Sequence, residues 1–234
     1  MSAQEISQKL RQLADPAIAE HSKRFFKTGE GEYGEGDRFL GIRVPVLREQ
    51  AKKYKTVSLV EIQSLLESIF HEERFCALLL LVQKFKKANE SEKSEIYRFY
   101  LNNTRYINNW DLVDTSAHHI VGPYLDAKDK QPLYELAKSN SLWDRRIAIM
   151  ATFHFIRNKH FDEALGISHQ LITDEQELIH KAVGWMLREI GKRDLAVEKM
   201  FLNAHYKKMP RTMLRYAIEK FPVEERQQYL EGLV

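Results

Sequence analysis

The stretch ELIHKAVGWMLRE, residues 177–189, indicates most clearly how the chain folds. Apolar side chains recur along it at positions zero, four, seven and eight: Leu178, Ala182, Trp185 and Met186. Because an α-helix turns once in about 3.6 residues, these positions share one face. We therefore expect an amphipathic helix that buries this face.

Similar spacing recurs along the rest of the chain. Two further faces of this kind are Ile62, Leu65, Leu66 and Ile69, and Ile147, Met150, Ala151 and His154. Ser58, with Glu61 three residues later, marks a helix N-terminus, and Pro210 and Pro222 suit first helical positions. No segment combines period-two alternation with turn dipeptides on both sides. The sequence thus predicts an all-α protein of roughly 12 to 14 helices joined by short loops.

The three tryptophans reveal a weak repeat. Trp110, Trp143 and Trp185 each lie in an amphipathic segment, at intervals of 33 and 42 residues. These uneven intervals are typical of two-helix repeats of the HEAT kind. We expect residues 1–234 to form a single domain of HEAT-like repeats, stacked into a curved solenoid whose concave face binds an extended partner.

Composition excludes several classes of protein. With 44% apolar and 29% charged residues among 234, the chain is long and apolar enough to bury a core. Its one cysteine, Cys76, excludes an internal disulfide and any metal site that needs paired thiolates. The apolar run from Cys76 to Val82 is far shorter than the roughly 20 residues of a membrane-spanning helix. The first ten residues are polar, so we expect no secretory signal and a cytoplasmic protein.

Positive charge is concentrated in the C-terminal third. Residues 180–220 hold ten Lys and Arg against four Asp and Glu, although the whole chain carries a net charge of only +3. Such a surface favours a polyanionic partner. An ordinary solvated helical surface explains the same count, and the charge alone does not choose between the two.

A glycine-rich loop is expected between Thr28 and Asp37. It contains a formal G-x-G-x-x-G at Gly29, Gly31 and Gly34. We do not interpret it as a dinucleotide site, because that motif follows a strand, whereas the preceding residues 23–27 are typical of a helix. The loop also carries four acidic residues, which would repel a pyrophosphate.

Common catalytic motifs are absent from the sequence. The pair His118-His119 lacks the spacing of a metal-binding helix, and no G-x-S-x-G nucleophile motif occurs. Cys76 lies in an apolar segment and is expected in the core. We therefore expect no metal site and no cofactor.

Three helical faces combine tryptophan with charge. Trp110 and Asp114 are four residues apart, and Trp143 and Arg146 are three apart. Lys181 and Arg188 flank Trp185 on a third face. Cations beside an indole are typical of contacts with a nucleic-acid backbone. A tryptophan at helical spacing is also often a core residue, and Lys181 has Glu177 within reach on the same helix.

At these residues the sequence resembles the AlkD family of DNA alkylation repair enzymes, which are HEAT-like-repeat DNA glycosylases. The resemblance extends from about Ile18 to Phe221 and is carried by five segments in the same order: Phe39–Pro45 with Arg48, Glu73–Phe75, Asn109–Asp114, Ser141–Arg146 and Lys181–Glu189.

The resemblance implies specific roles. Asp114 is the catalytic carboxylate, Trp110 and Trp185 flank the lesion, and Arg146 binds a phosphate. Further DNA contacts fall on Arg188, Lys181, Arg43 and Phe25, the last at a position where some members have tyrosine.

The implied reaction is hydrolysis of the N-glycosidic bond of a cationic alkylpurine, such as N3-methyladenine or N7-methylguanine, in double-stranded DNA. The sugar-phosphate is held on a concave surface and the base stays stacked. The chain is expected to be a monomer associated with the nucleoid through its DNA. Two alternatives remain open: a non-catalytic DNA-binding protein of this fold that prefers branched or bent DNA, and a solenoid that binds other proteins.

Overall fold

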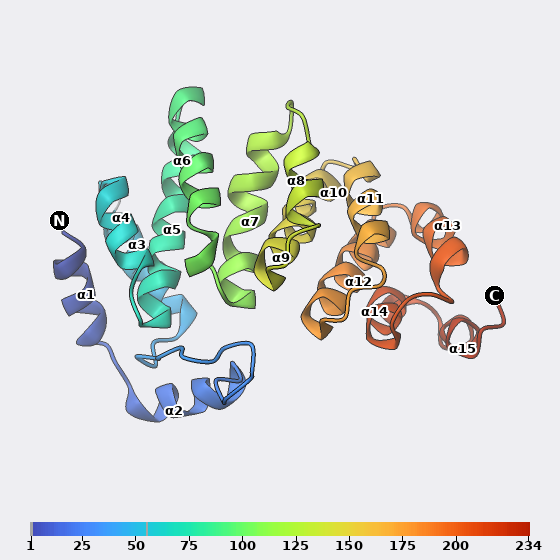
Figure 1. Cartoon of the computed structure of the whole chain (residues 1–234), viewed down its shortest axis with the longest axis horizontal. Coiled ribbons are helices and arrows are strands. Elements are labelled where there is room, and N and C mark those ends of the chain that lie inside the picture. Colours follow the sequence, from blue (N-terminus) through green and yellow to red (C-terminus); the bar gives the residue numbers. More distant parts are fainter. Residues whose placement is uncertain (1, 55) are drawn as a thin grey trace. The chain divides into compact units, whose positions relative to one another are not determined.

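A computed structural model describes residues 2–54 and 56–234, and it confirms the all-α prediction (Figure 1). Within these residues the only β-type pairing is an isolated bridge between Arg38 and Phe70. The helices are α1 (Ala3–Arg11), α2 (Pro16–Phe25), α3 (Val44–Lys53), α4 (Leu59–Leu66), α5 (His71–Lys87), α6 (Glu90–Asn102), η1 (Thr104–Tyr106), α7 (Trp110–Leu125), α8 (Gln131–Leu136), α9 (Leu142–Ala151), α10 (Phe153–Arg157), α11 (Asp162–Gln170), α12 (Glu177–Gly191), α13 (Leu195–His205), α14 (Arg211–Ala217), η2 (Ile218–Lys220) and α15 (Val223–Glu231).

Packing divides the chain into two compact units, residues 1–116 and residues 117–234. In each unit the helices pack mainly on helices that lie one to three places away in the sequence, as expected of helical repeats. The curved solenoid, its concave face and the single domain stay predictions.

In the first unit, α5 is the central helix. It packs against α3, α4 and α6, and all of its residues from His71 to Val82 are buried. A helix that is apolar on every side must be surrounded by protein, and the run from Cys76 to Val82 meets this condition. Cys76 lies in the core, as expected. In the described part of the chain, no helix is both long and apolar enough to span a bilayer.

In the second unit, α12 is the central helix and carries the stretch that opened the sequence analysis. It packs against α9, α13 and α14. Ala182 and Met186 are fully buried, whereas Trp185 is only partly buried. Gly184 lets α14 approach closely, because a Cβ atom there would lie 2.4 Å from the Met213 carbonyl oxygen and 2.5 Å from the Tyr216 Cβ.

The helix starts agree with the sequence signals at Ser58 and differ from them by one position at two prolines. The Ser58 hydroxyl caps α4 by accepting the Glu61 N–H at 3.3 Å. Pro210 and Pro222 lie one position earlier than expected, at the N-caps of α14 and α15. The expected helical face from Ile147 to His154 is interrupted: α9 ends and α10 begins at Thr152, whose hydroxyl donates to the Ile149 carbonyl at 2.6 Å.

The close approach at Gly184 gives a stability test. We expect Gly184→Ala to lower the free energy of unfolding by about 1–3 kcal/mol, because the added methyl group pushes α12 away from α14. Chemical denaturation measures this change. Gly29→Ala is the matched control, since its added methyl group meets only the flexible carboxylate of Glu32. Equal midpoints for the two variants would contradict the close packing.

Candidate functional site

Trp110 and Asp114 occupy the first turns of α7. The Asn109 side chain accepts the Trp110 N–H at 2.8 Å, and its carbonyl accepts the Val113 N–H, so Asn109 caps the helix. Asp114 follows Trp110 by four residues on the same face, and both side chains are partly exposed. The first unit therefore presents an indole and a carboxylate side by side.

Aromatic rings extend this face from Trp110. The Phe26 ring stacks on Trp110 with centroids 5.4 Å apart, and Phe25 meets Trp110 edge-on at 5.9 Å. Phe25 is 57% exposed although it is a large apolar side chain. The structure thus brings the predicted residues Phe25 and Trp110 together, and it adds Phe26, which the sequence reasoning missed.

The glycine-rich loop binds its own acidic residues. The Gly29 N–H donates to Glu32 at 2.8 Å, and the Gly31 N–H donates to Glu35 at 2.9 Å. These contacts use backbone donors that a phosphate site would need, and the loop follows helix α2 rather than a strand. Both facts agree with the rejection of a dinucleotide site.

The end of this loop is fixed by a buried carboxylate. Glu72 accepts the backbone N–H groups of Leu40, Gly41 and Ile42 at 2.8, 2.7 and 3.2 Å. Gly41 has φ +81°, and a Cβ there would collide with the Asp15 carbonyl, so glycine is required. Arg43 follows, exposed, at the N-cap of α3.

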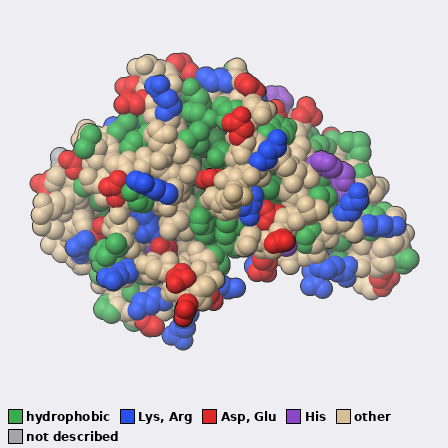
Figure 2. Space-filling model, viewed as in Figure 1, with side chains coloured by type: hydrophobic (Ala, Val, Ile, Leu, Met, Phe, Trp, Pro, Cys, Tyr) green, Lys and Arg blue, Asp and Glu red, His purple; other side chains and the backbone are tan. Residues whose placement is uncertain are grey.

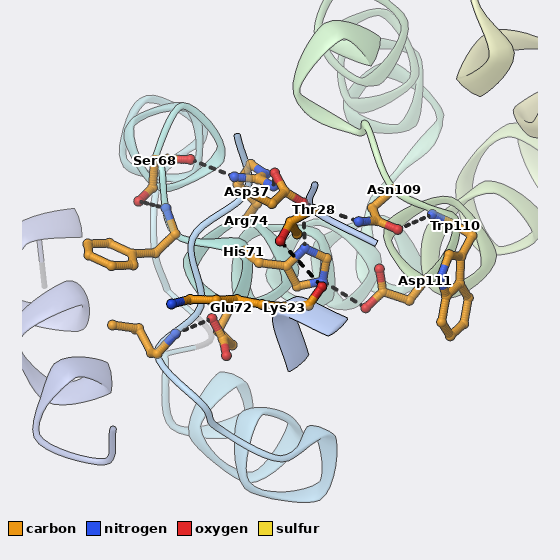
Figure 3. Close-up of polar contacts among 12 residues, drawn as sticks. Lys23, Thr28, Asp37, Ser68, His71, Glu72, Arg74, Asn109, Trp110 and Asp111 are labelled. Carbon is orange, nitrogen blue, oxygen red and sulfur yellow. Dashed lines mark hydrogen bonds and ion pairs between the residues drawn. The ribbon is translucent and has the colours of Figure 1, made fainter. Parts of the chain in front are cut away.

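A buried polar network lies behind Trp110 (Figure 3). His71, only 3% exposed, places Nε2 2.8 Å from Asp111 Oδ2 and Nδ1 3.3 Å from Asp37 Oδ2. Asp37 also accepts from Arg74 at 2.5 Å and from the Asn109 side chain at 3.1 Å. We call these five residues the His71 cluster. It joins the loop, α5 and the start of α7.

The geometry of the His71 cluster requires a charged imidazole. Both ring nitrogens face carboxylates, and a neutral imidazole carries only one N–H, so only the protonated ring donates to both. Burial lowers the pKa of His71, but the charge and hydrogen bond of Asp111 and the hydrogen bond of Asp37 raise this pKa to about 9. For the carboxyl group of Asp37, burial alone would raise the pKa. The hydrogen bond from His71 and the charge of Arg74 outweigh burial, so the pKa of Asp37 is lowered.

In the second unit, Trp185 contacts one aromatic ring and one carboxylate. Its ring is 6.2 Å from that of Phe153, and its Nε1 donates to Glu189 at 3.3 Å. Glu189 is buried and also accepts from Lys192 and Arg193. Burial raises the pKa of Glu189, but these hydrogen bonds outweigh it and lower the pKa. Trp185 is therefore fixed by a carboxylate that is itself neutralised.

The predicted cations of this unit have protein partners. Lys181 pairs with Glu177 at 3.1 Å, the alternative that the sequence left open, and Arg188 pairs with Glu219. Arg146 is only 4% exposed, and its Nη1 donates to the Leu178 carbonyl of α12 at 2.5 Å. The phosphate contacts of all three cations stay predictions.

Exposed positive charge lies nearer the C-terminus. Figure 2 shows Lys and Arg side chains grouped over the C-terminal helices. The exposed cations around α14 include Lys207, Lys208, Arg211, Arg215 and Lys220. Among the described residues, no three His, Cys, Asp or Glu side chains are arranged to hold a metal ion.

Comparison with known proteins agrees with the resemblance seen in the sequence. Residues 6–221 match the family described as DNA alkylation repair enzyme. The chain belongs to this family. Its fold is similar to a solved structure described as a predicted DNA alkylation repair enzyme from Enterococcus faecalis, with a TM-score of 0.70 and 17% identity over 90% of this chain and 97% of that chain. At that identity the likeness shows the fold alone. The search of curated proteins finds no match.

For this DNA alkylation repair family member, the sequence reasoning missed the His71 cluster. Its members come from positions 37, 71, 74, 109 and 111, and no local spacing links them. One signal was available: His71-Glu72-Glu73-Arg74 places four ionisable residues directly before an apolar helical run. Ionisable side chains are seldom buried unless they are paired, so partners elsewhere in the chain could have been sought.

The charged state of His71 predicts how stability depends on pH. The folded chain keeps a proton up to about pH 9, whereas the unfolded chain loses it near 6.5. We therefore expect the stabilisation to be complete below pH 6.5 and lost as the pH rises to 9, a decrease on the order of 3 kcal/mol in the free energy of unfolding.

Urea denaturation at several pH values, compared between the parent and His71→Gln, isolates this effect. The comparison is needed because burial raises the pKa of Glu198 to about 8, so stability also falls between pH 4.5 and 8 for a separate reason. Both chains contain Glu198, and the difference between them belongs to His71. Parallel pH profiles would contradict a charged His71.

Proposed function

We propose that this protein is a DNA glycosylase that hydrolyses the N-glycosidic bond of cationic alkylpurines, such as N3-methyladenine and N7-methylguanine, in double-stranded DNA. The observation that carries the proposal is the placement of Asp114 one helical turn after Trp110, whose ring contacts the exposed ring of Phe25, in a chain of the DNA alkylation repair family. The proposed hydrolysis uses neither a metal ion nor a cofactor.

The proposed chemistry depends on charge. Alkylation makes the base a cationic leaving group, and its departure moves positive charge onto the deoxyribose as an oxocarbenium ion. The Asp114 carboxylate stabilises this ion and orients the attacking water. The face of Trp110 also attracts positive charge, because its π electrons give it a negative potential. Both groups thus bind the transition state more tightly than the neutral sugar.

The second unit contributes DNA binding in this proposal. Trp185 packs against the lesion nucleotide, while Arg146, Lys181 and Arg188 act on the backbone. Lys181 and Arg188 exchange their glutamate partners for phosphates, and a partly exposed ion pair contributes little stability, so this exchange costs little. Arg43 and Phe25 extend the contacts from the first unit.

The role of Asp114 is tested by Asp114→Asn, which keeps the shape and removes the charge. We expect base release from alkylated duplex DNA to fall by roughly 10²-fold, about 3 kcal/mol. DNA affinity should persist, because a carboxylate near phosphates repels them. Single-turnover excision and a melting curve on the same preparation give the two readouts.

Asp126→Asn is the matched control, since Asp126 is an exposed carboxylate just beyond the end of the same helix. Parental excision by Asp114→Asn would remove the proposed mechanism. A loss of activity that only follows a loss of folded protein would make Asp114 a structural residue.

Salt dependence tests the proposed backbone contacts. Neutralising one phosphate releases about one counterion, so Lys181→Ala and Arg188→Ala should each flatten the slope of log K against log[salt] by about one. Lys86→Ala, an exposed lysine near the C-terminal end of α5, is the control and should leave the slope unchanged. Unchanged slopes for Lys181 and Arg188 would leave their glutamate pairs as their only role.

A further inference from the structure

His71 is connected to Trp110 by two routes within the first unit. The polar route runs through α7: His71 binds Asp111, the residue after Trp110, and Asp37 holds Asn109, which caps the Trp110 N–H. Together these contacts fix both residues that flank Trp110 in the sequence.

The second route runs through aromatic rings. The His71 ring contacts both Phe26 and Phe39, with centroids 4.9 Å from each, and these two rings also stack on each other at 5.1 Å. Phe26 then stacks on Trp110 at 5.4 Å, and Phe25 meets both Phe26 and Trp110 edge-on. A shift of the imidazole therefore moves the layer on which Trp110 rests.

We propose that His71, as an imidazolium, is a positioning residue that sets the orientation of Trp110 for the excision reaction. This inference rests on the proposed function and adds a residue to it. His71 contacts neither the sugar nor the base in this scheme, and it acts through α7 and through Phe26.

The proton is what makes the positioning strong. The charged groups that face His71 are Asp37 from the loop, Asp111 from α7 and Arg74 from its own helix, and the rings of Phe26 and Phe39 cover it. When the ring loses a proton, one of its nitrogens becomes an acceptor that faces a carboxylate oxygen. The lone pair of that nitrogen and the negatively charged oxygen then repel each other, which weakens the contact of α5 with the start of α7 or with the loop.

Asp111 is especially sensitive to this loss. Its Oδ1 accepts no hydrogen bond from the described residues, and its Oδ2 accepts from His71. Without that donor, a carboxylate that is only 12% exposed, at the first turn of α7, lacks a hydrogen-bond partner among the described residues, which is costly. We expect the turn that carries Trp110 to rearrange in response.

Fluorescence of Trp110 tests the inference directly. The chain has three tryptophans, so Trp143→Phe together with Trp185→Phe leaves Trp110 as the sole indole. We expect its emission to change as the pH rises through about 9, the pKa of His71. Adding His71→Gln should abolish this transition, and His160→Gln, at an exposed histidine of the second unit, should leave it intact. A transition that survives His71→Gln would overturn the inference.

Excision provides the second arm, in chains that keep all three tryptophans. We expect His71→Gln to lower single-turnover excision at pH 7 by about tenfold or more, because small displacements of catalytic groups are costly, while DNA affinity is retained. The double variant His71→Gln/Asp111→Asn should recover much of the rate, since two neutral amides can bond to each other. We expect the activity of the parent to decline as the pH rises above 9, and this decline should be absent from the double variant.

The two arms separate failures of the two proposals. Parental excision by folded His71→Gln at pH 7 would overturn the positioning role and leave the glycosylase proposal intact. If the parent itself releases no alkylated base, the glycosylase proposal fails, and the positioning role for excision fails with it, whereas the fluorescence arm still decides whether His71 controls Trp110. Melting curves at each pH restrict the comparison to folded protein.

Discussion

The first unit depends on the ionic hydrogen bonds that join the buried His71 to the carboxylates of Asp37 and Asp111. Burying a charge is unfavourable unless it is paired and hydrogen-bonded. Here the imidazole donates to Asp37 and Asp111, and Arg74 adds a second cation against Asp37. The two positive and two negative charges balance, so the cluster remains buried without a net charge. Removal of one member leaves another charge unpaired, which makes the arrangement specific.

The first turn of α5 also binds three other parts of the first unit. Successive residues of a helix point about 100° apart. Glu72 accordingly accepts the backbone N–H groups of residues 40–42, Glu73 binds Ser7 and Arg11 of α1, and Arg74 binds Asp37. Consecutive side chains thus hold α1, the glycine-rich loop and the start of α7 on one central helix. The position of Trp110 at the start of α7 therefore depends on the contacts made by residues 71–74 of α5.

How much of this was predictable depends on the range of the interaction. The face of α12 that buries Ala182 and Met186 follows from local spacing, and so does the cap at Ser58. The break at Thr152 escaped prediction because a side-chain hydrogen bond to the backbone ends the helix without any glycine or proline. The His71 cluster escaped because its pairs join residues 34 to 72 positions apart. Helical periodicity carries no information at that separation. The family resemblance indicated Trp110 and Asp114, but it did not indicate the residues of the His71 cluster that hold the start of α7.

The neutrality of the His71 cluster matters for the proposed chemistry. An unbalanced cation beneath Phe26 and Trp110 would oppose the approach of a positively charged alkylpurine, because fields are poorly screened in a protein interior. Asp37 and Asp111 cancel the charges of His71 and Arg74, so the support under Trp110 exerts little net force on the base. In the proposed reaction, Asp114 supplies the negative charge on the same face as Trp110, where the oxocarbenium ion is expected to form. A charged histidine is therefore compatible with a cationic substrate only because both carboxylates accompany it, and the same two contacts that position Trp110 also remove the repulsion.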